Sequence, residues 1–351
     1  MRRAGIVGTG LIGGSIGMAL KARGWRVTGT DRDEERATRA LELGALDAVG
    51  TDPDAEITFV ATPVSAVANA AREALSRGAG FVTDVGSVKA PTVEAVGDRR
   101  FVGGHPMAGS EQEGVDGADP SLFQGAVWVL TPTGDTDDAA YASVRSVVSS
   151  LGAEVVALAP DRHDALVAVV SHVPHLTAAT LMRLASDRSE DHAALLRLAA
   201  GGFRDMTRIA AGHPGIWPDI CAENRGAIVE VLDRLSDALT DMRDLVAKGD
   251  RDGLLDVLER ARAARVNLPS RFARPDDLAE VRVPVPDRPG VLADVTTLAT
   301  DLDVNILDLE IAHSGEGQRG VLILIIEAAM GERLRGGLVA RGYRPSIRSL
   351  E

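Results

Sequence analysis

The stretch AGIVGTGLIGGS, residues 4–15, decides how the first part of the chain folds. A short apolar run leads into Gly8, Gly10 and Gly13 at the spacing Gly-x-Gly-x-x-Gly, and a helical pattern follows at once. In such a unit the first glycine allows a tight turn, the second lets the backbone approach a pyrophosphate, and the third lets the helix pack on the strand. The stretch therefore predicts a strand, a turn and a helix whose N-terminus receives the phosphates of a dinucleotide.

The next predicted strand ends at Asp31, roughly 20 residues beyond the glycines, where a carboxylate bonds the ribose hydroxyls of the cofactor. This charge would repel a 2′-phosphate, so we expect NAD rather than NADP. NADP remains an alternative, because the guanidinium of Arg32 could bind that phosphate. The residues predicted to bind the cofactor are Gly8, Gly10, Leu11, Ile12, Gly13, Asp31, Arg32, Thr62 and Pro63.

Apolar runs and helical patterns alternate from residue 4 to about residue 158, which predicts a mostly parallel α/β sheet with helices on both faces. We assign residues 1–159 to a Rossmann-type NAD-binding domain. The predicted strands are Ala4–Val7, Arg26–Thr30, Ile57–Ala61, Gly80–Asp84, Arg100–Gly103, Val127–Leu130 and Glu154–Ala157. The predicted helices are Leu11–Arg23, Glu34–Leu43, Ser65–Arg77 and Thr136–Leu151.

Residues 160–267 contain almost no strand pattern, and we expect an all-helical domain there. Apolar residues recur at helical spacing over Asp161–Leu184 and Glu223–Lys248, and Pro174 should kink the first helix near Val170–Ser171. Long helices with this many apolar residues often pack against a second subunit. We therefore expect a homodimer formed through this domain.

Residues 268–277, rich in proline and charge, are predicted to be a linker. The order β-α-β-β-α-β over residues 278–351 describes a ferredoxin-like α+β domain. Its predicted elements are strand Glu280–Pro284, helix Val291–Asp301, strands Asn305–Ala312 and Gly320–Glu327, helix Gly331–Arg341 and strand Arg344–Ser349.

The composition excludes several classes of protein. With 351 residues the chain is too long for one core, and its net charge of -13 argues against nucleic-acid partners and anionic membranes. The single cysteine, Cys221, rules out an internal disulfide and fits a reducing compartment. We find no secretory h-region and no uncharged apolar run of roughly 18 residues, so we expect a cytoplasmic protein without a membrane partner.

Two polar, glycine-rich segments follow predicted strands, DVGSVK at 84–89 and GGHPMAGSE at 103–111. Ligands collect beyond the carboxyl ends of the strands in such a sheet. His105 is therefore a candidate general base, because a neutral imidazole can take a hydroxyl proton as hydride leaves. Ser87 could orient the substrate hydroxyl or the nicotinamide amide. A structural role in a turn remains open for both residues.

The helical domain offers further candidates. His172 and His175 lie three residues apart, but no third ligand has fitting spacing, so no metal site is predicted and both are taken as pocket or core histidines. Arg204 and Arg208 could clamp a carboxylate or lie on a solvated helix face. The β-hydroxyacid dehydrogenases share this layout but use a lysine of the helical domain, and Lys248 is poorly placed for that role.

Together these motifs resemble the prephenate/arogenate dehydrogenases. The resemblance covers roughly residues 4–250 and rests on GLIGGS at 10–15, DVGSVK, GGHPMAGSE, SHVPH at 171–175, GGFRDMTRIA at 201–210 and the IW…EN pattern at 216–224. It implies oxidative decarboxylation of a cyclohexadienyl ring, with His105 accepting the hydrogen bond of the ring hydroxyl and Ser87 contacting that hydroxyl and the nicotinamide. It also implies that Arg208 holds a substrate carboxylate. The remaining residues placed in the substrate pocket are His175, Ser110, Glu111, Trp217, Gly201 and Asp205.

The C-terminal unit resembles an ACT domain, with the turn Asp287-Arg-Pro-Gly290 one residue shorter than the usual pattern. This resemblance implies feedback by tyrosine. We favour prephenate over arogenate as the substrate. A β-hydroxyacid-type reductase and a non-catalytic sensor of NAD and an amino acid are the alternatives; turnover of hydroxyacids would favour the first, and NAD binding without turnover the second.

Overall fold

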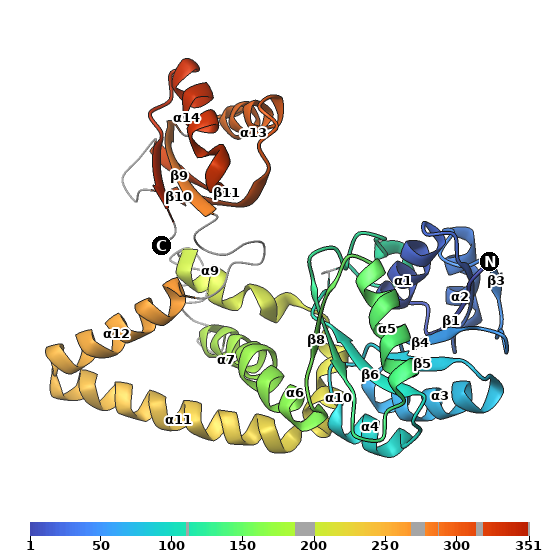
Figure 1. Cartoon of the computed structure of the whole chain (residues 1–351). Coiled ribbons are helices and arrows are strands. Elements are labelled where there is room, and N and C mark those ends of the chain that lie inside the picture. Colours follow the sequence, from blue (N-terminus) through green and yellow to red (C-terminus); the bar gives the residue numbers. More distant parts are fainter. Residues whose placement is uncertain (110–111, 187–200, 268–277, 287, 314–318, 350–351) are drawn as a thin grey trace. The chain divides into compact units, whose positions relative to one another are not determined.

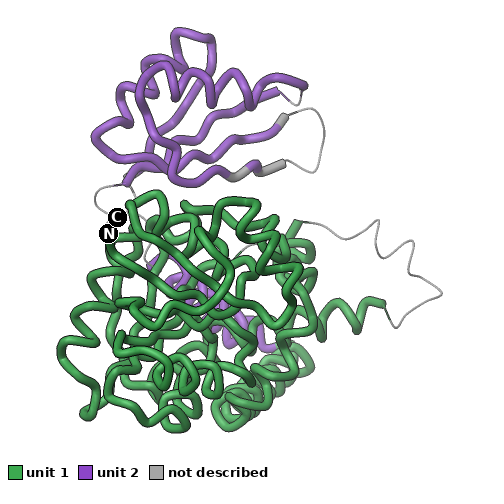
Figure 2. Tube along the Cα trace, turned by 90° about the vertical axis from the view of Figure 1, so that its right-hand side faces the viewer, with its two compact units in different colours: residues 1–249 green, residues 250–351 purple. Residues whose placement is uncertain are grey.

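A computed structural model describes residues 1–109, 112–186, 201–267, 278–286, 288–313 and 319–349 (Figure 1). The chain forms two compact units, Met1–Gly249 and Asp250–Glu351 (Figure 2). The boundary lies inside the predicted helical domain, so the last helix of that domain is grouped with the C-terminal unit. The predicted linker, 268–277, lies outside the described residues.

The first unit is built on an eight-stranded sheet in the order β3-β2-β1-β4-β5-β6-β7-β8. All neighbouring strands are parallel except β6 and β7, which are antiparallel, so the prediction of a mostly parallel sheet is confirmed. The strands are β1 Arg3–Val7, β2 Arg26–Thr30, β3 Ala48–Val49, β4 Ile57–Val60, β5 Phe81–Asp84, β6 Phe101–Pro106, β7 Val127–Thr131 and β8 Glu154–Ala157.

Helices cover both faces of this sheet because the strands alternate apolar residues between two cores. Ile6 and Phe59 lie on one face, in a core shared with α1 and α5, and Val60 and Val82 lie on the other, against α3 and α4. The helices are α1 Leu11–Lys21, α2 Glu34–Glu42, α3 Val64–Arg77, α4 Ala90–Val96 and α5 Asp138–Ser150.

A helical region completes the first unit, and its first long helix is interrupted where the sequence predicted a kink. Pro174 has no N–H to donate to the carbonyl of Val170, and Ala168–His172 forms a π turn there. The elements are α6 Pro160–Val167, the π turn, α7 Val173–Ser186, α9 Gly201–Thr207, 3-10 turns Arg208–Ala211 and Pro214–Ile216, α10 Trp217–Glu223 and α11 Arg225–Lys248.

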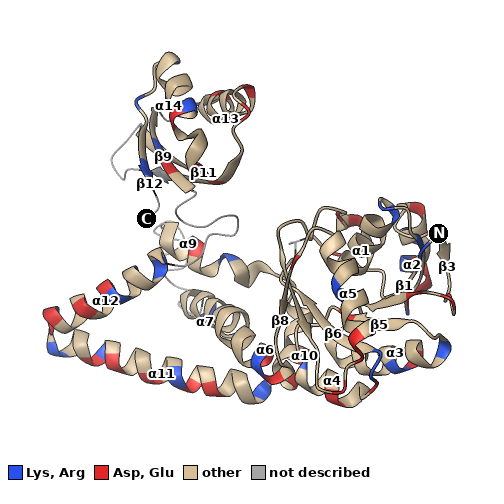
Figure 3. Cartoon of the chain, viewed as in Figure 1, with Lys and Arg blue, Asp and Glu red and all other residues tan. Residues whose placement is uncertain are grey.

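The stretch Pro160–Ser186 is long and apolar enough to cross a membrane by length and mean hydropathy (1.5), although no such run was predicted from the sequence. Charged residues flank its apolar part at Asp164 and Arg183, and polar residues such as His172 interrupt it; His163 and His172 are buried by neighbouring elements. In Figure 3 α7 carries almost no charge, whereas acidic and basic residues intersperse along α11. We therefore interpret the stretch as a helix of a protein interior or interface.

The second unit contains α12, Arg251–Val266, and a four-stranded antiparallel sheet in the order β10-β11-β9-β12. Two helices pack on this sheet around a core that includes Val281, Val295 and Leu334. The predicted order β-α-β-β-α-β is confirmed. Its elements are β9 Leu278–Pro286, α13 Val291–Asp301, β10 Ile306–His313, β11 Arg319–Glu327, α14 Gly331–Ala340 and β12 Ser346–Ser349.

Candidate active site

The glycine-rich turn between β1 and α1 forms a cradle for an anion. Gly8 has φ +94°, and a Cβ there would lie 2.5 Å from the carbonyl oxygen of Ala61. A Cβ on Gly13 would lie 1.9 Å from the carbonyl oxygen of Gly8, whereas one on Gly10 would meet nothing within 4 Å. Within the described part of the chain, no side chain caps the N-terminus of α1. Its N–H groups and the open space at Gly10 fit a pyrophosphate.

Asp31 lies directly beside this cradle at the end of β2. Its carboxylate accepts hydrogen bonds from the N–H of Thr9 (2.7 Å) and of Asp33 (3.0 Å), which hold it in place. A carboxylate has about four lone-pair positions, so it can still accept from ribose hydroxyls. On the other side of Gly8, the buried hydroxyl of Thr62 has no partner among the described residues. Arg32 is exposed, and Pro63 begins α3. These residues fit NAD.

A buried ion pair joins the two polar segments that the sequence singled out. The ammonium group of Lys89 bonds the carboxylate of Asp84 and the carbonyl of Gly104 (2.8 Å), and both charged side chains are fully buried. Asp84 also accepts from the N–H of Gly86 (2.8 Å) and of Gly104 (3.0 Å). Burial lowers the pKa of Lys89, and Asp84 opposes this shift. The pair thus fixes the turn that carries Ser87 against the strand that carries His105.

His105 begins a chain of hydrogen bonds that orients its ring. Its Nδ1 lies 2.8 Å from Nε2 of His163, whose Nδ1 lies 2.7 Å from a carboxylate oxygen of Asp164. The carboxylate of Asp164 also accepts from the N–H of Lys89 and Ala90, both at 2.8 Å, so it can only accept from His163. With a neutral ring, His163 then accepts at Nε2, and His105 donates at Nδ1. This leaves Nε2 of His105 as an acceptor.

The surroundings keep His105 neutral. Burial lowers its pKa well below 6.5, and the nearby His163, Lys89 and His172 lower it further. A neutral imidazole with a bare Nε2 can accept a hydroxyl proton or its hydrogen bond.

Asn224 links this series of hydrogen bonds to the aromatic rings of His172, Trp217 and His175. Its amide nitrogen donates to the carbonyl of Asp164 (2.9 Å) and lies 3.2 Å from Nδ1 of His172. The ring of His172 makes an edge contact with Trp217, at 6.2 Å between centroids, and His175 stacks on Trp217 at 3.6 Å. One continuous set of contacts therefore joins His105 to His175 through residues of β6, α6, the π turn, α7, α10 and Asn224.

The remaining predicted substrate residues lie on other segments of the chain. Gly201 and Asp205 lie on α9, and Arg208 begins the 3-10 turn that packs on α7; all three are exposed. Ser110 and Glu111 lie outside the described residues. The sequence interpretation assigned no role to His163, Asp164 or Asn224. For His163 and Asp164 the signal was a His-Asp pair beside Pro160 at a helix start, too common to single out; Asn224 ends the IW…EN pattern, which carried the resemblance but no assigned role.

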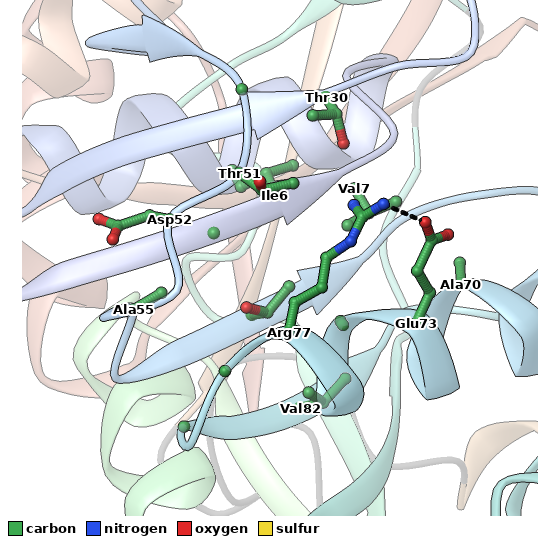
Figure 4. Close-up of a pocket in the computed structure, with 16 residues that line it drawn as sticks. Ile6, Val7, Thr30, Thr51, Asp52, Ala55, Ala70, Glu73, Arg77 and Val82 are labelled. Carbon is green, nitrogen blue, oxygen red and sulfur yellow. Dashed lines mark ion pairs between the residues drawn. The ribbon is translucent and has the colours of Figure 1, made fainter.

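Among the cavities that His105 does not line, two lie in the first unit beside α3 and between α7 and α11. One, of about 70 Å³, lies between the sheet and α3 and is lined by Gly5, Thr58, Ala70 and Ala74, with the Arg77–Glu73 ion pair beside it (Figure 4). The other is an apolar groove of about 540 Å³ between α7 and α11. The described residues gather no group of three or more metal-ligating side chains.

Three domain families match the chain: the nucleotide-binding domain of prephenate dehydrogenase over residues 16–157, the dimerization domain of prephenate dehydrogenase over 159–260, and the ACT domain over 279–335. A prephenate dehydrogenase of Bacillus subtilis is 34% identical over 334 residues, 90% of each chain. The chain belongs to the prephenate dehydrogenase family. The resemblance inferred from the motifs is confirmed.

Solved structures agree with this family assignment. A prephenate dehydrogenase of A. aeolicus, in complex with hydroxyphenyl propionate and NAD+, is 30% identical with a TM-score of 0.72, covering 77% of this chain and 99% of that one. A Synechocystis arogenate dehydrogenase is 31% identical with a TM-score of 0.66, covering 75% and 98%. The prediction of NAD as the cofactor is confirmed by the family's nucleotide-binding domain and by the relative that holds NAD+.

Proposed function

We propose that the chain oxidises prephenate to 4-hydroxyphenylpyruvate and CO2 with reduction of NAD+, a step of tyrosine biosynthesis. The observation that carries the proposal is the bare Nε2 of a neutral His105, held by His163 and Asp164 beside a dinucleotide cradle. Aromatisation of the ring supplies most of the driving force, so the protein needs only positioning, a modest base and charge complementarity.

Each residue of the site then has a distinct task. Nε2 of His105 accepts the hydrogen bond of the ring hydroxyl and draws its proton away as hydride leaves the same carbon. Ser87, in the turn fixed by Lys89 and Asp84, contacts that hydroxyl. Arg208 holds a substrate carboxylate. His175, Trp217, Ser110, Glu111, Gly201 and Asp205 complete the substrate pocket.

NAD+, when bound, accepts the hydride. Gly8, Gly10, Leu11, Ile12 and Gly13 present backbone N–H groups and open space to its pyrophosphate, and Asp31 accepts from its ribose hydroxyls. Arg32, Thr62 and Pro63 border the same end of the sheet. Asp31 disfavours a 2′-phosphate by charge repulsion, which supports NAD over NADP.

Arogenate is the second candidate substrate, because the similar Synechocystis chain is an arogenate dehydrogenase. The two substrates differ only in a keto or amino group on the side chain. A few pocket contacts therefore decide between them.

We further propose a cytoplasmic homodimer formed through residues 160–267. The dimerization-domain match supports this, as do exposed apolar side chains at Val170 (65%), Met206 (62%) and Leu239 (58%). Only Ile228 is buried along the 24 residues of α11, in a small cluster with Ala168 and Val173, so most of this helix has little cover within one chain. Light scattering at micromolar concentration should give twice the 36.8 kDa of one chain, and a mass of one chain would refute the dimer.

The activity is tested by following NADH formation at 340 nm with NAD+ and either prephenate or arogenate. We expect turnover of prephenate and a loss of roughly 100- to 10,000-fold in His105→Ala, because general-base catalysis contributes about this much. An equal rate in His105→Ala would exclude the assigned base. Absence of turnover of either substrate with NAD+ still bound would refute the proposed reaction.

A further inference from the structure

The residue that accepts the hydrogen bond of His105 is itself a base. In many proteins the second nitrogen of a functional histidine donates to a backbone carbonyl or a carboxylate, which orients the ring. Here Nδ1 of His105 lies 2.8 Å from Nε2 of His163, an imidazole nitrogen that can bind a proton. Orientation requires only an acceptor, so His163 has a capacity that the proposed reaction does not use.

The carboxylate of Asp164 is placed to stabilise a positive charge on His163. One of its oxygens lies 2.7 Å from Nδ1 of His163. The N–H groups of Lys89 and Ala90, both at 2.8 Å, hold the carboxylate in this position. A proton that moves from His105 to His163 therefore places the positive charge in a charge-assisted hydrogen bond with a fixed carboxylate.

The surroundings of His105 oppose a positive charge on its own ring. Burial lowers the pKa of His105 well below 6.5, and charges on His163 and Lys89 lower it further. The ammonium group of Lys89 is held close by, on the carbonyl of Gly104 (2.8 Å). His105 is half-buried, whereas His163 is fully buried. His105 can thus reach a substrate, and His163 can hold an added proton behind it.

The proposed reaction needs a group that holds a proton for a time, but it releases no proton overall. The ring hydroxyl loses its proton as hydride leaves the same carbon for NAD+, and its oxygen becomes a carbonyl. When the bond to the departing carboxylate breaks, the electron pair of that bond passes through the ring to this oxygen. The oxygen then regains a proton as a phenol. Prephenate and NAD+ thus give 4-hydroxyphenylpyruvate, CO2 and NADH with no net proton.

We propose that His163, paired with Asp164, holds one proton between these two events and returns it through His105. This inference rests on the proposed function. In the forward direction the hydroxyl proton binds Nε2 of His105, and the proton on Nδ1 of His105 passes to Nε2 of His163. After CO2 has left, Nε2 of His163 returns its proton to Nδ1 of His105, and Nε2 of His105 gives its proton to the phenolate oxygen. His163 acts through His105 and needs no contact with the substrate.

Two substitutions of His163 separate proton transfer from orientation. In His163→Gln the amide oxygen can occupy the place of Nε2 and accept from His105, but an amide is too weak a base to take the proton. His163→Leu offers no acceptor. We expect both variants to lower the single-turnover rate of prephenate oxidation at least about tenfold, with the affinity for NADH unchanged. Recovery of the wild-type rate in His163→Gln would overturn the proposal, because orientation would then suffice.

A solvent isotope effect gives a readout that packing alone does not change. Two protons move together in the forward direction, so the single-turnover rate of the wild type should fall along a curve as the fraction of D2O rises. In His163→Gln only the hydroxyl proton moves, and the same plot should be a straight line. A straight line or the absence of an isotope effect in the wild type would overturn the proposal.

A third measurement locates the proton without turnover. The full chain, labelled with ¹⁵N at its seven histidines, is mixed with NAD+ and 3-(3,5-difluoro-4-hydroxyphenyl)propionate, whose fluorines make the phenol more acidic. The signals of the two rings are assigned by their loss in His105→Gln and His163→Gln. We expect the ¹⁹F spectrum of a bound phenolate, and ¹⁵N shifts of a protonated His163 beside a neutral His105.

Three spectra would overturn the proposal: a protonated His105 beside a neutral His163, a bound phenol with both rings neutral, or a His163 already protonated before the probe is added. Failure of the proposed reaction is a different result, namely no turnover of prephenate by the wild type. It leaves these spectra interpretable, because the probe needs only to bind.

Discussion

At the scale of single residues, the orientation of His105 depends on a neighbour 58 positions away in the sequence. Nε2 of His163 is the acceptor for the N–H of His105, and Asp164 keeps that acceptor in the required tautomer. Without His163, Nδ1–H of His105 would lose its partner, and the ring could rotate or change tautomer. A base in the wrong tautomer cannot accept the hydroxyl proton.

We therefore expect His163→Leu to lower kcat/KM by roughly ten- to a hundredfold, part of the contribution of a general base, with NAD affinity unchanged. The measurements are steady-state rates and a fluorescence titration with NADH. His313→Leu, on β10 of the other compact unit, serves as the control and should behave as the wild type. Full activity in His163→Leu would show that His105 needs no orienting partner.

The same buried histidines should make stability depend on pH. Burial lowers the pKa of His105 and of His172, the latter to about 4, whereas histidine in the unfolded chain titrates near 6.5. Below about pH 6.5 these histidines bind protons in the unfolded chain but stay neutral in the folded chain. The free energy of unfolding therefore falls as pH falls. For His172 the fall extends to about pH 4, at up to about 1.4 kcal/mol per pH unit.

Urea midpoints should therefore be constant from pH 8 to 7 and decline from about pH 6.5 to 5, with a smaller decline in His172→Gln. This range lies above the titration of ordinary carboxylates, so the histidines dominate it. Parallel declines in the variant and the wild type would show that His172 does not contribute.

At the scale of elements, the first turn of α1 faces the cofactor cradle on one side and protein on another. A Cβ on Gly10 would meet nothing within 4 Å, whereas a Cβ on Gly14 would lie 2.9 Å from Val115 and 3.0 Å from Ala118. These two residues belong to the segment between β6 and β7, which is also held by the bond from the N–H of Asp119 to the hydroxyl of Ser15 (3.0 Å).

Matched substitutions at Gly10 and Gly14 should distinguish the side of α1 that faces the cofactor from the side that packs on protein. Gly10→Val should leave the melting temperature without cofactor unchanged and weaken NAD binding at least about tenfold, because its side chain fills the space for the pyrophosphate. Gly14→Val should lower the melting temperature by several degrees, since overpacking costs about 1–3 kcal/mol. Thermal unfolding and NADH titration measure both effects. Similar stability losses in the two variants would contradict this division.

The elements also show how far the sequence could predict the molecule. Strands Arg26–Thr30 and Glu154–Ala157 were predicted with their observed bounds, because β-branched residues gather in each of these short runs. The two-residue β3 and the helix α4 were missed, since neither is long enough to show a period. The extension of β6 to Pro106 was missed because His105 is paired there by the antiparallel β7, a tertiary contact.

The candidate site also has one part that the sequence could predict and one part that it could not. The cofactor cradle could be predicted because one local motif builds it. The pairing of His105 with His163 and of Asn224 with His172 could not, because each joins segments more than 50 residues apart that only the fold brings together.

At the scale of the whole molecule, the catalytic residues and the ACT domain occupy different compact units, each with its own core. The solved A. aeolicus chain aligns over 99% of its length with 77% of this chain. A protein of this family thus folds and binds NAD+ and hydroxyphenyl propionate within that shorter length. The C-terminal unit is therefore expected to regulate the reaction without supplying catalytic groups.

We expect tyrosine to inhibit the full chain, and a chain ending at Asn267 to keep turning over prephenate but lose that inhibition. The reason is that all residues assigned to catalysis precede Gly249, whereas the turn at Arg288–Gly290, where ACT domains bind amino acids, lies in the second unit. The measurement is NADH formation with and without tyrosine for both chains at equal concentration. Light scattering on both chains controls for a changed oligomeric state. Inhibition of equal strength in the shortened chain would place tyrosine in the substrate pocket, where it would compete with prephenate through the same phenolic ring.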